Sequence, residues 1–337
     1  MTTTSGQLEA PFALARYRAG DEVRLGLIAG DRIRPLGPQE LGAPGLNDFL
    51  AAPDWDRLEE LAQGGGPWVS LESVVLTAPV EPRQVLQTGA NYRTHVIDLV
   101  VAGLDKDDPR TPEQAREWAG KMMDDRQANG EPYFFIGLPA CVVGDDVPLV
   151  LPSYSEKHDW ELELAVVIGK EAFRVSREEA TQHVAGYTVV NDITTRDLVF
   201  RRDMKEIGTD WYRSKNAPGF LPTGPFLVPA RFVDPAKLKV RLELNGDVMQ
   251  DATTDDLLFD IPALVSAASQ NMPLLPGDLL LTGSPAGNGA HWGRLLRAGD
   301  VMTGSIQGLG TQVVRCVAEP VADQASDAVV GQASRQA

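Results

Sequence analysis

The chain has 337 residues and a formal charge of −16, from 31 lysines and arginines against 47 aspartates and glutamates. Hydrophobic residues make up 43% and charged residues 23%, which is the balance of a globular protein able to bury a substantial core. A polyanion of this size repels phosphate backbones and anionic lipids, so the composition disfavours nucleic-acid and membrane-surface roles. An acidic protein can still bind an acidic ligand when a bound cation reverses the local field.

Cysteine content and the N-terminal sequence both favour a reducing compartment. Cys141 and Cys316 lie inside apolar segments, which predicts two buried free thiols rather than a disulfide. The N-terminal residues show no basic region followed by an apolar run. No window approaches the roughly 18 apolar residues of a transmembrane helix. We therefore expect a cytoplasmic protein without a membrane span.

The first part of the chain predicts a small α+β unit. Residues 12–36 alternate short apolar runs with Gly-Asp turns, which is typical of strands joined by hairpins. Residues 46–62 predict one or two short helices, and the Gly-rich segment 63–67 ends them. Residues 78–82 contain two prolines and are interpreted as a linker.

A polar, charged segment at residues 100–131 predicts one long helix. Thr111 and Gln114 form a capping-box pattern, with Pro112 at the first helical position. The Asn-Gly pair at 129–130 is expected to end the helix. A charged helix of this kind is usually a solvated surface. Its position soon after candidate catalytic residues also allows a lid, and the sequence leaves both alternatives open.

From residue 132 onward, β-patterns dominate the sequence. Residues 161–169 and 187–193 predict apolar strands, and the Asn-Gly pair at 245–246 predicts a hairpin. Strands outnumber helices and follow hairpin order rather than βαβ alternation. The predicted fold class is therefore α+β with a mixed, β-rich core.

These patterns set the predicted domain limits. Residues 1–80 form the small N-terminal domain, and residues 81–320 form the main domain. Residues 321–337 are small and polar, which predicts a disordered tail.

Three acidic residues make the strongest candidate site. Glu161 and Glu163 lie two residues apart on a predicted strand, so both side chains leave the same face. An isolated Glu-x-Glu usually marks a solvent-facing strand, but here both faces become apolar further on, so the charges need a metal or arginines as compensation. Asp192, which alone would suggest a turn, follows the next apolar strand. The set predicts Mg²⁺ or Mn²⁺, and the lack of a histidine–cysteine cluster disfavours zinc.

Six segments in order resemble the core of the fumarylacetoacetate hydrolase family. They are DWELELAVVIGK, GYTVVNDITTRD, WYRSKNAPGFLPTGPFLV, NGDVMQDATT, PGDLLLTGSPAGNG and IQGLGTQVV. The resemblance spans roughly residues 84–318, and several ordered motifs are more specific than any one alone. It implies a mixed β-roll core behind a small N-terminal α+β domain, usually a homodimer. It also implies Glu161, Glu163 and Asp192 as the Mg²⁺ or Mn²⁺ ligands.

The resemblance further implies residues that contact the substrate. Lys215 stands where the family has a lysine near the metal, which makes it a catalytic candidate, and Arg196 stands at the position of a family arginine. Thr282 matches a position from which members offer a hydroxyl to the substrate. Either cation alone would indicate an ordinary surface salt bridge. Beside a metal, both are expected to hold a small anionic oxo-acid.

The segment GANYRTHVIDLV resembles the NYxxHxxE segment of the family and supplies the acid–base candidates. His95 is the expected base, Asp98 is placed to orient its imidazole, and Tyr92 is a candidate for binding the substrate. A His-Asp pair at this spacing is more often incidental, and aspartate in place of glutamate shortens the reach by one methylene. Ile136 and Gly137 are a second departure, because many members have Phe-x-Lys there.

The leading hypothesis is a hydrolase that cleaves a carbon–carbon bond in a 2,4-dioxo acid, such as an acylpyruvate or a fumarylpyruvate-like acid from aromatic compound catabolism. His95, oriented by Asp98, would activate a water, while the metal and Lys215 would stabilise the departing enolate. The first alternative is an oxo-acid decarboxylase or isomerase, of the oxaloacetate or 2-hydroxyhepta-2,4-diene-1,7-dioate type. A sugar-acid dehydratase is a third possibility. A non-catalytic binding protein predicts loss of an acidic ligand, and none is lost.

Overall fold

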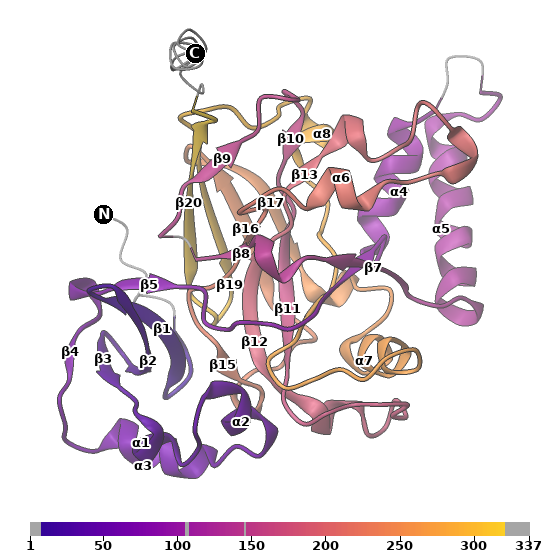
Figure 1. Cartoon of the computed structure of the whole chain (residues 1–337). Coiled ribbons are helices and arrows are strands. Elements are labelled where there is room, and N and C mark those ends of the chain that lie inside the picture. The colour runs from indigo at the N-terminus through magenta and orange to yellow at the C-terminus, as the bar shows by residue number, and fades with distance from the viewer. Residues whose placement is uncertain (1–7, 105–107, 145, 321–337) are drawn as a thin grey trace, which may run out of the picture.

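The computed structural model describes residues 8–104, 108–144 and 146–320. Within these residues, mixed sheets and helices form an α+β fold, as predicted (Figure 1). The predicted disordered tail, 321–337, lies outside the described residues. Every helix within the described residues is too short or too polar to cross a bilayer.

Residues 13–77 form an antiparallel sheet with three short helices, at the left of Figure 1. The strand order is β4-β3-β2-β1-β5, and the hairpins predicted from the Gly-Asp turns are confirmed. The predicted helices are present, and the last of them ends at Gln63, before the Gly-rich segment. The elements are β1 (Ala13–Ala19), β2 (Glu22–Ala29), β3 (Arg32–Pro35), α1 (Pro38–Leu41), α2 (Leu46–Ala51), α3 (Trp55–Gln63), β4 (Val69–Ser70) and β5 (Val75–Thr77).

This N-terminal sheet shares its hydrophobic core with the rest of the chain. Leu14 and Leu227 exchange two backbone hydrogen bonds of 2.9 and 2.8 Å. Phe12 and Leu14 lie in the same buried cluster as Ala165 and Val167 of the central sheet. The hydrophobic core is therefore continuous across residue 80, and the two domain limits stay a prediction.

The central sheet has six strands in the order β15-β12-β11-β18-β6-β7. Its pairs are antiparallel except for β18 with β6. All residues of β11 are buried, which fits its apolar residues on both faces. The strands are β6 (Val85–Gly89), β7 (Tyr133–Gly137), β11 (Leu162–Ile168), β12 (Val184–Asn191), β15 (Val228–Pro229) and β18 (Leu279–Leu281).

A second sheet, ordered β17-β16-β19-β20-β9, packs against the central one. The two sheets come close at Gly304, where a Cβ atom would lie 2.5 Å from Leu162 Cδ1. The predicted hairpin at 245–246 is confirmed, with Asn245 and Gly246 both at positive φ, as a two-residue turn of this kind requires. The strands are β9 (Leu149–Leu151), β16 (Lys239–Leu244), β17 (Asp247–Thr253), β19 (Val301–Ile306) and β20 (Thr311–Ala318). Two short pairs complete the strands: β8 (Val142–Val143) with β14 (Leu221–Pro222), and β10 (His158–Asp159) with β13 (Thr194–Thr195).

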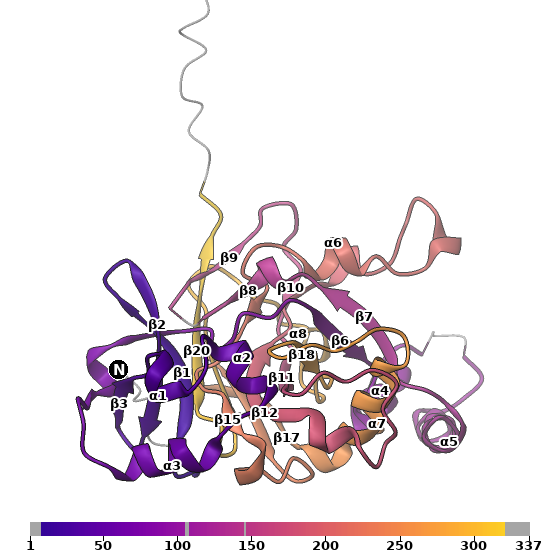
Figure 2. The ribbon, with the colours of Figure 1, turned by 60° about the horizontal axis from the view of Figure 1, so that its bottom comes forward.

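Two helices, α4 (Arg93–Ala102) and α5 (Pro112–Asn129), pack together on the side away from the N-terminal sheet, at the right of Figures 1 and 2. The predicted start and end of α5 are confirmed, including the reciprocal hydrogen bonds between Thr111 and Gln114. Ala119 and Met123 bury one face of α5, and the alternative that this segment acts as a lid stays a prediction. The other helices are α6 (Trp211–Lys215), α7 (Ile261–Ser269) and α8 (Gly289–Trp292).

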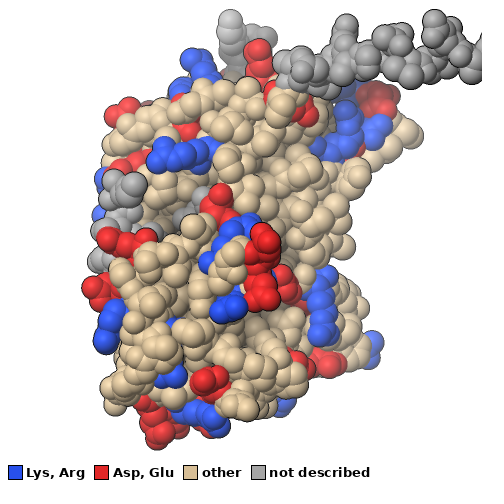
Figure 3. All heavy atoms as spheres, turned by 60° about the vertical axis from the view of Figure 1, so that its left-hand side comes forward, with Lys and Arg blue, Asp and Glu red and all other residues tan. Residues whose placement is uncertain are grey.

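Charges on the surface are intermixed. On the face shown in Figure 3, lysine and arginine side chains lie beside aspartates and glutamates rather than gathering in one basic patch. Arg16 with Glu81 and Arg18 with Asp146 are examples of such pairs in the chain. Both cysteines are buried free thiols, as predicted, and burial raises the pKa of Cys141 to about 11.

Candidate metal centre and active site

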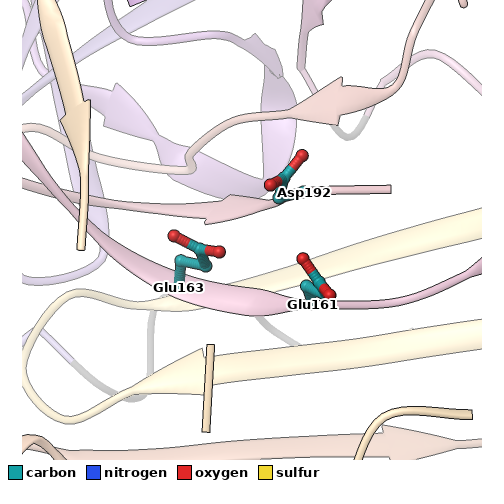
Figure 4. A group of neighbouring side chains, drawn as sticks. All are labelled: Glu161, Glu163 and Asp192. Atoms are coloured by element: carbon teal, nitrogen blue, oxygen red, sulfur yellow. The ribbon is translucent and has the colours of Figure 1, made fainter. Parts of the chain in front are cut away.

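Three carboxylates converge at the start of β11. Glu161 and Glu163 leave one face of this strand, and Asp192 follows the end of β12. Because β11 and β12 are antiparallel, with Leu162 opposite Asn191, Asp192 lies beside Glu161 and donates its backbone N–H to the Glu161 carbonyl at 2.8 Å. One oxygen from each carboxylate lies within 4.8 Å of the others (Figure 4). At this spacing, the three carboxylate oxygens could coordinate the same metal ion.

Lys215 enters this group from the end of α6. It is 2% exposed, and Glu163 and Asp192 are 2% and 1% exposed. Its Nζ donates three hydrogen bonds, to Glu161 Oε2 at 2.7 Å, Asp192 Oδ2 at 2.5 Å and Thr194 Oγ1 at 2.7 Å. The structure therefore brings the predicted lysine into direct contact with two of the three predicted metal ligands.

Arg196 joins the group to a fourth carboxylate. Its Nη1 lies 2.8 Å from Glu161 Oε1, and its Nε donates to Asp159 Oδ2 at 2.6 Å. Asp159 is fully buried and also accepts the backbone N–H groups of Gly289 and Ala290. Asp159 is absent from the predicted site residues. It stands two residues before Glu161, so the same alternation that singles out Glu161 and Glu163 also points to it.

The electrostatics leave room for a divalent cation. Within the described residues, the ion pairs of these four carboxylates involve two cations, Lys215 and Arg196. Burial, and then the charges of Asp192 and Glu161, raise the pKa of Glu163 well above its usual range. Burial also raises the pKa of Asp192, to about 6, against the opposing effect of Lys215. Burial acts on Glu161 too, but Lys215 and Arg196 outweigh it and hold the pKa of Glu161 at about 2.

Three buried polar atoms of the site lack a hydrogen-bond partner among the described residues. They are Gln87 Oε1, Tyr92 Oη and Arg196 Nη2. Burial, and then the nearby charge of Glu163, raise the pKa of Tyr92, so its hydroxyl keeps its proton. Buried polar atoms are normally satisfied, and a bound ligand would satisfy the Tyr92 hydroxyl and Arg196 Nη2. Together with the excess of carboxylates, they show that the residues present fit a hard cation and a polar ligand.

The two predicted acid–base residues, His95 and Asp98, both lie on α4. Burial lowers the pKa of His95, and the charge of Glu161 opposes this effect, so the imidazole is neutral at pH 7. Asp98 forms an ion pair with Arg116 of α5, at 2.9 Å. No hydrogen bond joins His95 to Asp98 within the described ranges. The catalytic role of each residue stays a prediction.

Thr282 is fully buried beside the site, and its hydroxyl donates to the Leu164 carbonyl at 2.9 Å. The next residue, Gly283, donates its backbone N–H to Glu163 Oε2 at 2.7 Å. The structure thus places a main-chain amide, rather than the threonine hydroxyl, against the carboxylates. The predicted contact of Thr282 with a substrate stays a prediction.

Comparison with known proteins identifies the family. Residues 84–317 match the family model described as Fumarylacetoacetate (FAA) hydrolase C-terminal. The chain belongs to the fumarylacetoacetate hydrolase family. This result confirms the resemblance that the ordered motifs carry, over nearly the same residues.

Members similar to this chain catalyse different reactions. Oxaloacetate tautomerase YisK from Bacillus subtilis is 35% identical over 248 residues, which cover 72% of this chain and 73% of that protein. The crystal structure of 2-hydroxyhepta-2,4-diene-1,7-dioate isomerase from Mycobacterium marinum is 29% identical, with a TM-score of 0.67, and covers 92% of this chain and 100% of its own. Maleylpyruvate hydrolase from Sphingobium sp. SYK-6, solved with manganese(II) and pyruvate, is 28% identical, with a TM-score of 0.68, and covers 91% and 100%. The family thus includes tautomerases, isomerases and hydrolases.

Proposed function

We propose that this protein is a divalent-metal-dependent enzyme that interconverts the keto and enol forms of a small 2-oxo acid, with oxaloacetate as the first candidate. The observation that favours this reaction over hydrolysis is the partner of Asp98. Its carboxylate pairs with Arg116, and no hydrogen bond joins it to His95 within the described residues, so the arrangement lacks the oriented pair expected for activating a water. Moving a proton between carbon and oxygen needs a neutral base but no attacking water. The similarity to an oxaloacetate tautomerase supports the same choice.

Glu161, Glu163 and Asp192 would hold Mg²⁺ or Mn²⁺. When bound, the ion supplies a Lewis acid that makes the carbon next to the 2-oxo group more acidic. Lys215 and Arg196 offset the negative field that would otherwise repel an anionic substrate. Arg196 Nη2 has no partner among the described residues and would donate to a carboxylate oxygen of the substrate.

His95 would take a proton from the carbon next to the oxo group and deliver it to the oxo oxygen. The enol formed therefore has the same atoms and the same charge as the keto acid. The buried Tyr92 hydroxyl, which has no partner among the described residues, would donate a hydrogen bond to the same substrate.

A second candidate is hydrolysis of a 2,4-dioxo acid, which is the leading hypothesis from the sequence. Two observations favour it: the neutral imidazole of His95 lies close enough to Glu161 to sense its charge, and the chain is similar to maleylpyruvate hydrolase. In this case His95 would deprotonate water without help from Asp98.

One experiment separates the two candidates. The enol absorbance of oxaloacetate is followed with Mg²⁺, with Mn²⁺ and with a chelator, while acylpyruvates and maleylpyruvate are assayed for release of two acids. The proposal predicts metal-dependent approach to the keto–enol equilibrium, without CO₂ release. Metal-dependent release of two acids would favour the second candidate. If the protein acts neither on oxaloacetate nor on the acylpyruvates and maleylpyruvate, both candidate functions are wrong.

We also propose that the protein forms a homodimer and resides in the cytoplasm. Phe200, Ile207 and Tyr212 are exposed apolar residues near α6, at 68%, 56% and 71%, and a subunit contact would cover such a surface. Light scattering on the purified chain tests the dimer, with twice the chain mass of 36.4 kDa as the expected result. The buried free thiols agree with a reducing compartment.

A further inference from the structure

We propose that Gln87 is a positioning residue of the metal centre: its side-chain amide fixes the orientation of Asp192, and Gly137 is a glycine because this amide occupies the space beside it. The inference rests on the proposed metal-dependent function. Gln87 is not among the site residues predicted from the sequence, and Gly137 enters there only as a departure from the Phe-x-Lys pattern of the family.

The first observation is the contact with Asp192. Gln87 lies on β6 and is 1% exposed, and its Nε2 donates to Asp192 Oδ1 at 2.6 Å. A carboxylate only accepts hydrogen bonds, so the amide nitrogen must face Asp192 and the amide oxygen must face away. Lys215 Nζ holds the other oxygen, Oδ2, at 2.5 Å. Donors from two separate elements therefore fix both oxygens of this carboxylate, as partners of metal ligands typically do.

The second observation is the space beside the amide oxygen. Gly137 lies on β7, two residues from the position opposite Gln87. A Cβ atom at residue 137 would lie 2.8 Å from Gln87 Oε1 and 3.1 Å from Gln87 Cδ. Because Asp192 holds the amide in place, Gln87 cannot move aside without breaking the hydrogen bond. A side chain at residue 137 is thus incompatible with the observed position of Gln87.

The third observation shows that packing alone does not account for glutamine here. Gln87 Oε1 is buried and has no hydrogen-bond partner within the part of the chain that the structure describes. A buried acceptor without a donor costs free energy, so a purely structural role would favour an apolar side chain of similar volume. The contact that distinguishes glutamine from leucine or methionine is the one to Asp192.

The chain offers a matched control in Gln84. Its Nε2 donates to Asp278 Oδ2 at 2.6 Å, which is the same type of contact at the same distance. Asp278 precedes β18, whose first residue pairs with Val167 near the end of β11, whereas the metal centre lies at the start of β11. Gln84 is half-buried and its Nε2 also donates to the Pro273 carbonyl at 3.1 Å, so Gln84→Leu removes an amide–carboxylate hydrogen bond of the same length at the other end of the sheet.

The test measures Mn²⁺ affinity by calorimetry and the unfolding midpoint of the metal-free protein. Gln87→Leu is expected to weaken Mn²⁺ binding about 10- to 100-fold, the usual effect of losing a partner of a metal ligand. Gln84→Leu is expected to leave the affinity within about twofold of the wild type. Should Gln87→Leu fail to fold, Gln87→Met provides the same comparison with an unbranched side chain.

Gly137→Ala tests the second half of the proposal. It is expected to weaken Mn²⁺ binding in the wild-type background and to have no further effect on Mn²⁺ binding in a Gln87→Ala background, where only the 3.2 Å contact with Val85 Cγ1 remains. The inference would be overturned if folded Gln87→Leu protein bound Mn²⁺ with wild-type affinity. It would also be overturned if the effects of Gly137→Ala and Gln87→Ala on Mn²⁺ affinity were additive. A wild-type protein that binds no Mn²⁺ would instead overturn the proposed metal-dependent function, and the inference with it.

Discussion

Two aspartates lie buried at opposite ends of the central sheet. Asp278 is surrounded by neutral hydrogen-bond donors, whereas Asp192 lies among charged side chains. Asp278, before β18, is fully buried and accepts hydrogen bonds from three residues: Arg83 and Leu275 through backbone N–H groups, and Gln84 through both its backbone and its side chain. No ion pair involves Asp278 in the described part of the chain. Asp192, after β12, is equally buried but shares its surroundings with two other carboxylates and Lys215.

This difference shows which feature indicates a functional site. Burial alone raises the pKa of Asp278, yet neutral donors satisfy its oxygens, so its role is to hold a turn. At the other end, Glu161 and Glu163 crowd against Asp192, and two cations do not balance the carboxylates around them. Crowding of like charges in a buried place has no structural benefit, and a divalent cation would relieve it.

The largest expected effect is on Mn²⁺ affinity, and it distinguishes the two ends of the central sheet. Glu163→Gln removes one proposed ligand and is expected to weaken Mn²⁺ binding more than about 100-fold, beyond the loss typical of an outer partner. Asp278→Asn is expected to leave Mn²⁺ binding intact but to lower the free energy of unfolding by about 1–3 kcal/mol, because an amide nitrogen then faces N–H donors. Calorimetry and thermal unfolding measure both. Equal losses of Mn²⁺ affinity in the two variants would remove the distinction between the ends of the sheet.

The next effect concerns His95, which lies near the crowded end but is not a proposed ligand. His95→Gln is expected to lower turnover about 10²- to 10⁴-fold, the usual contribution of a general base. Its Mn²⁺ affinity is expected to stay within about threefold of the wild type. Steady-state kinetics with saturating Mn²⁺ measure the loss, and near-normal turnover would exclude His95 as the base.

Acidity should weaken metal binding at the crowded end. The pKa of Asp192 is about 6, so this carboxylate gains a proton in the metal-free protein as the pH falls through 6. The pKa of Glu163 is raised well above its usual range, so protonation competes with metal binding there too. Metal binding must displace these protons. Mn²⁺ affinity is therefore expected to decrease on acidification, by about tenfold per pH unit for each proton displaced. Titrations between about pH 5 and pH 8 that give one constant affinity would contradict this account.

The smallest expected effect is that of Asp98. Because its carboxylate pairs with Arg116 at a partly exposed position, Asp98→Asn is expected to change turnover by less than about threefold and the free energy of unfolding by less than about 1 kcal/mol. A loss of turnover as large as that of His95→Gln would instead support the catalytic pair expected from the sequence, formed when a substrate binds.

Local patterns were sufficient for a large part of the fold and for the acidic residues. The capping box of α5 and the Asn-Gly hairpin involve neighbours in the chain, so their residue types determine them. The two-residue spacing of Glu161 and Glu163, and the position of Asp192 after an apolar strand, are equally local.

The contacts that the sequence could not predict are those between distant segments. Gln87 and Asp192 are 105 positions apart and meet only because the sheet places β6 in the order β12-β11-β18-β6. Asp98 was expected to face His95 on its own helix, but the packing of α5 brings Arg116 to it. Strand order and helix packing depend on the whole core rather than on one segment.

The most direct test of the central claim is a crystal structure of the protein grown with Mn²⁺, with anomalous scattering used to locate the ion. The account predicts one strong peak per chain, coordinated by oxygens of Glu161, Glu163 and Asp192. Well-ordered carboxylates without a peak between them, at an Mn²⁺ concentration that saturates any binding seen in solution, would contradict it.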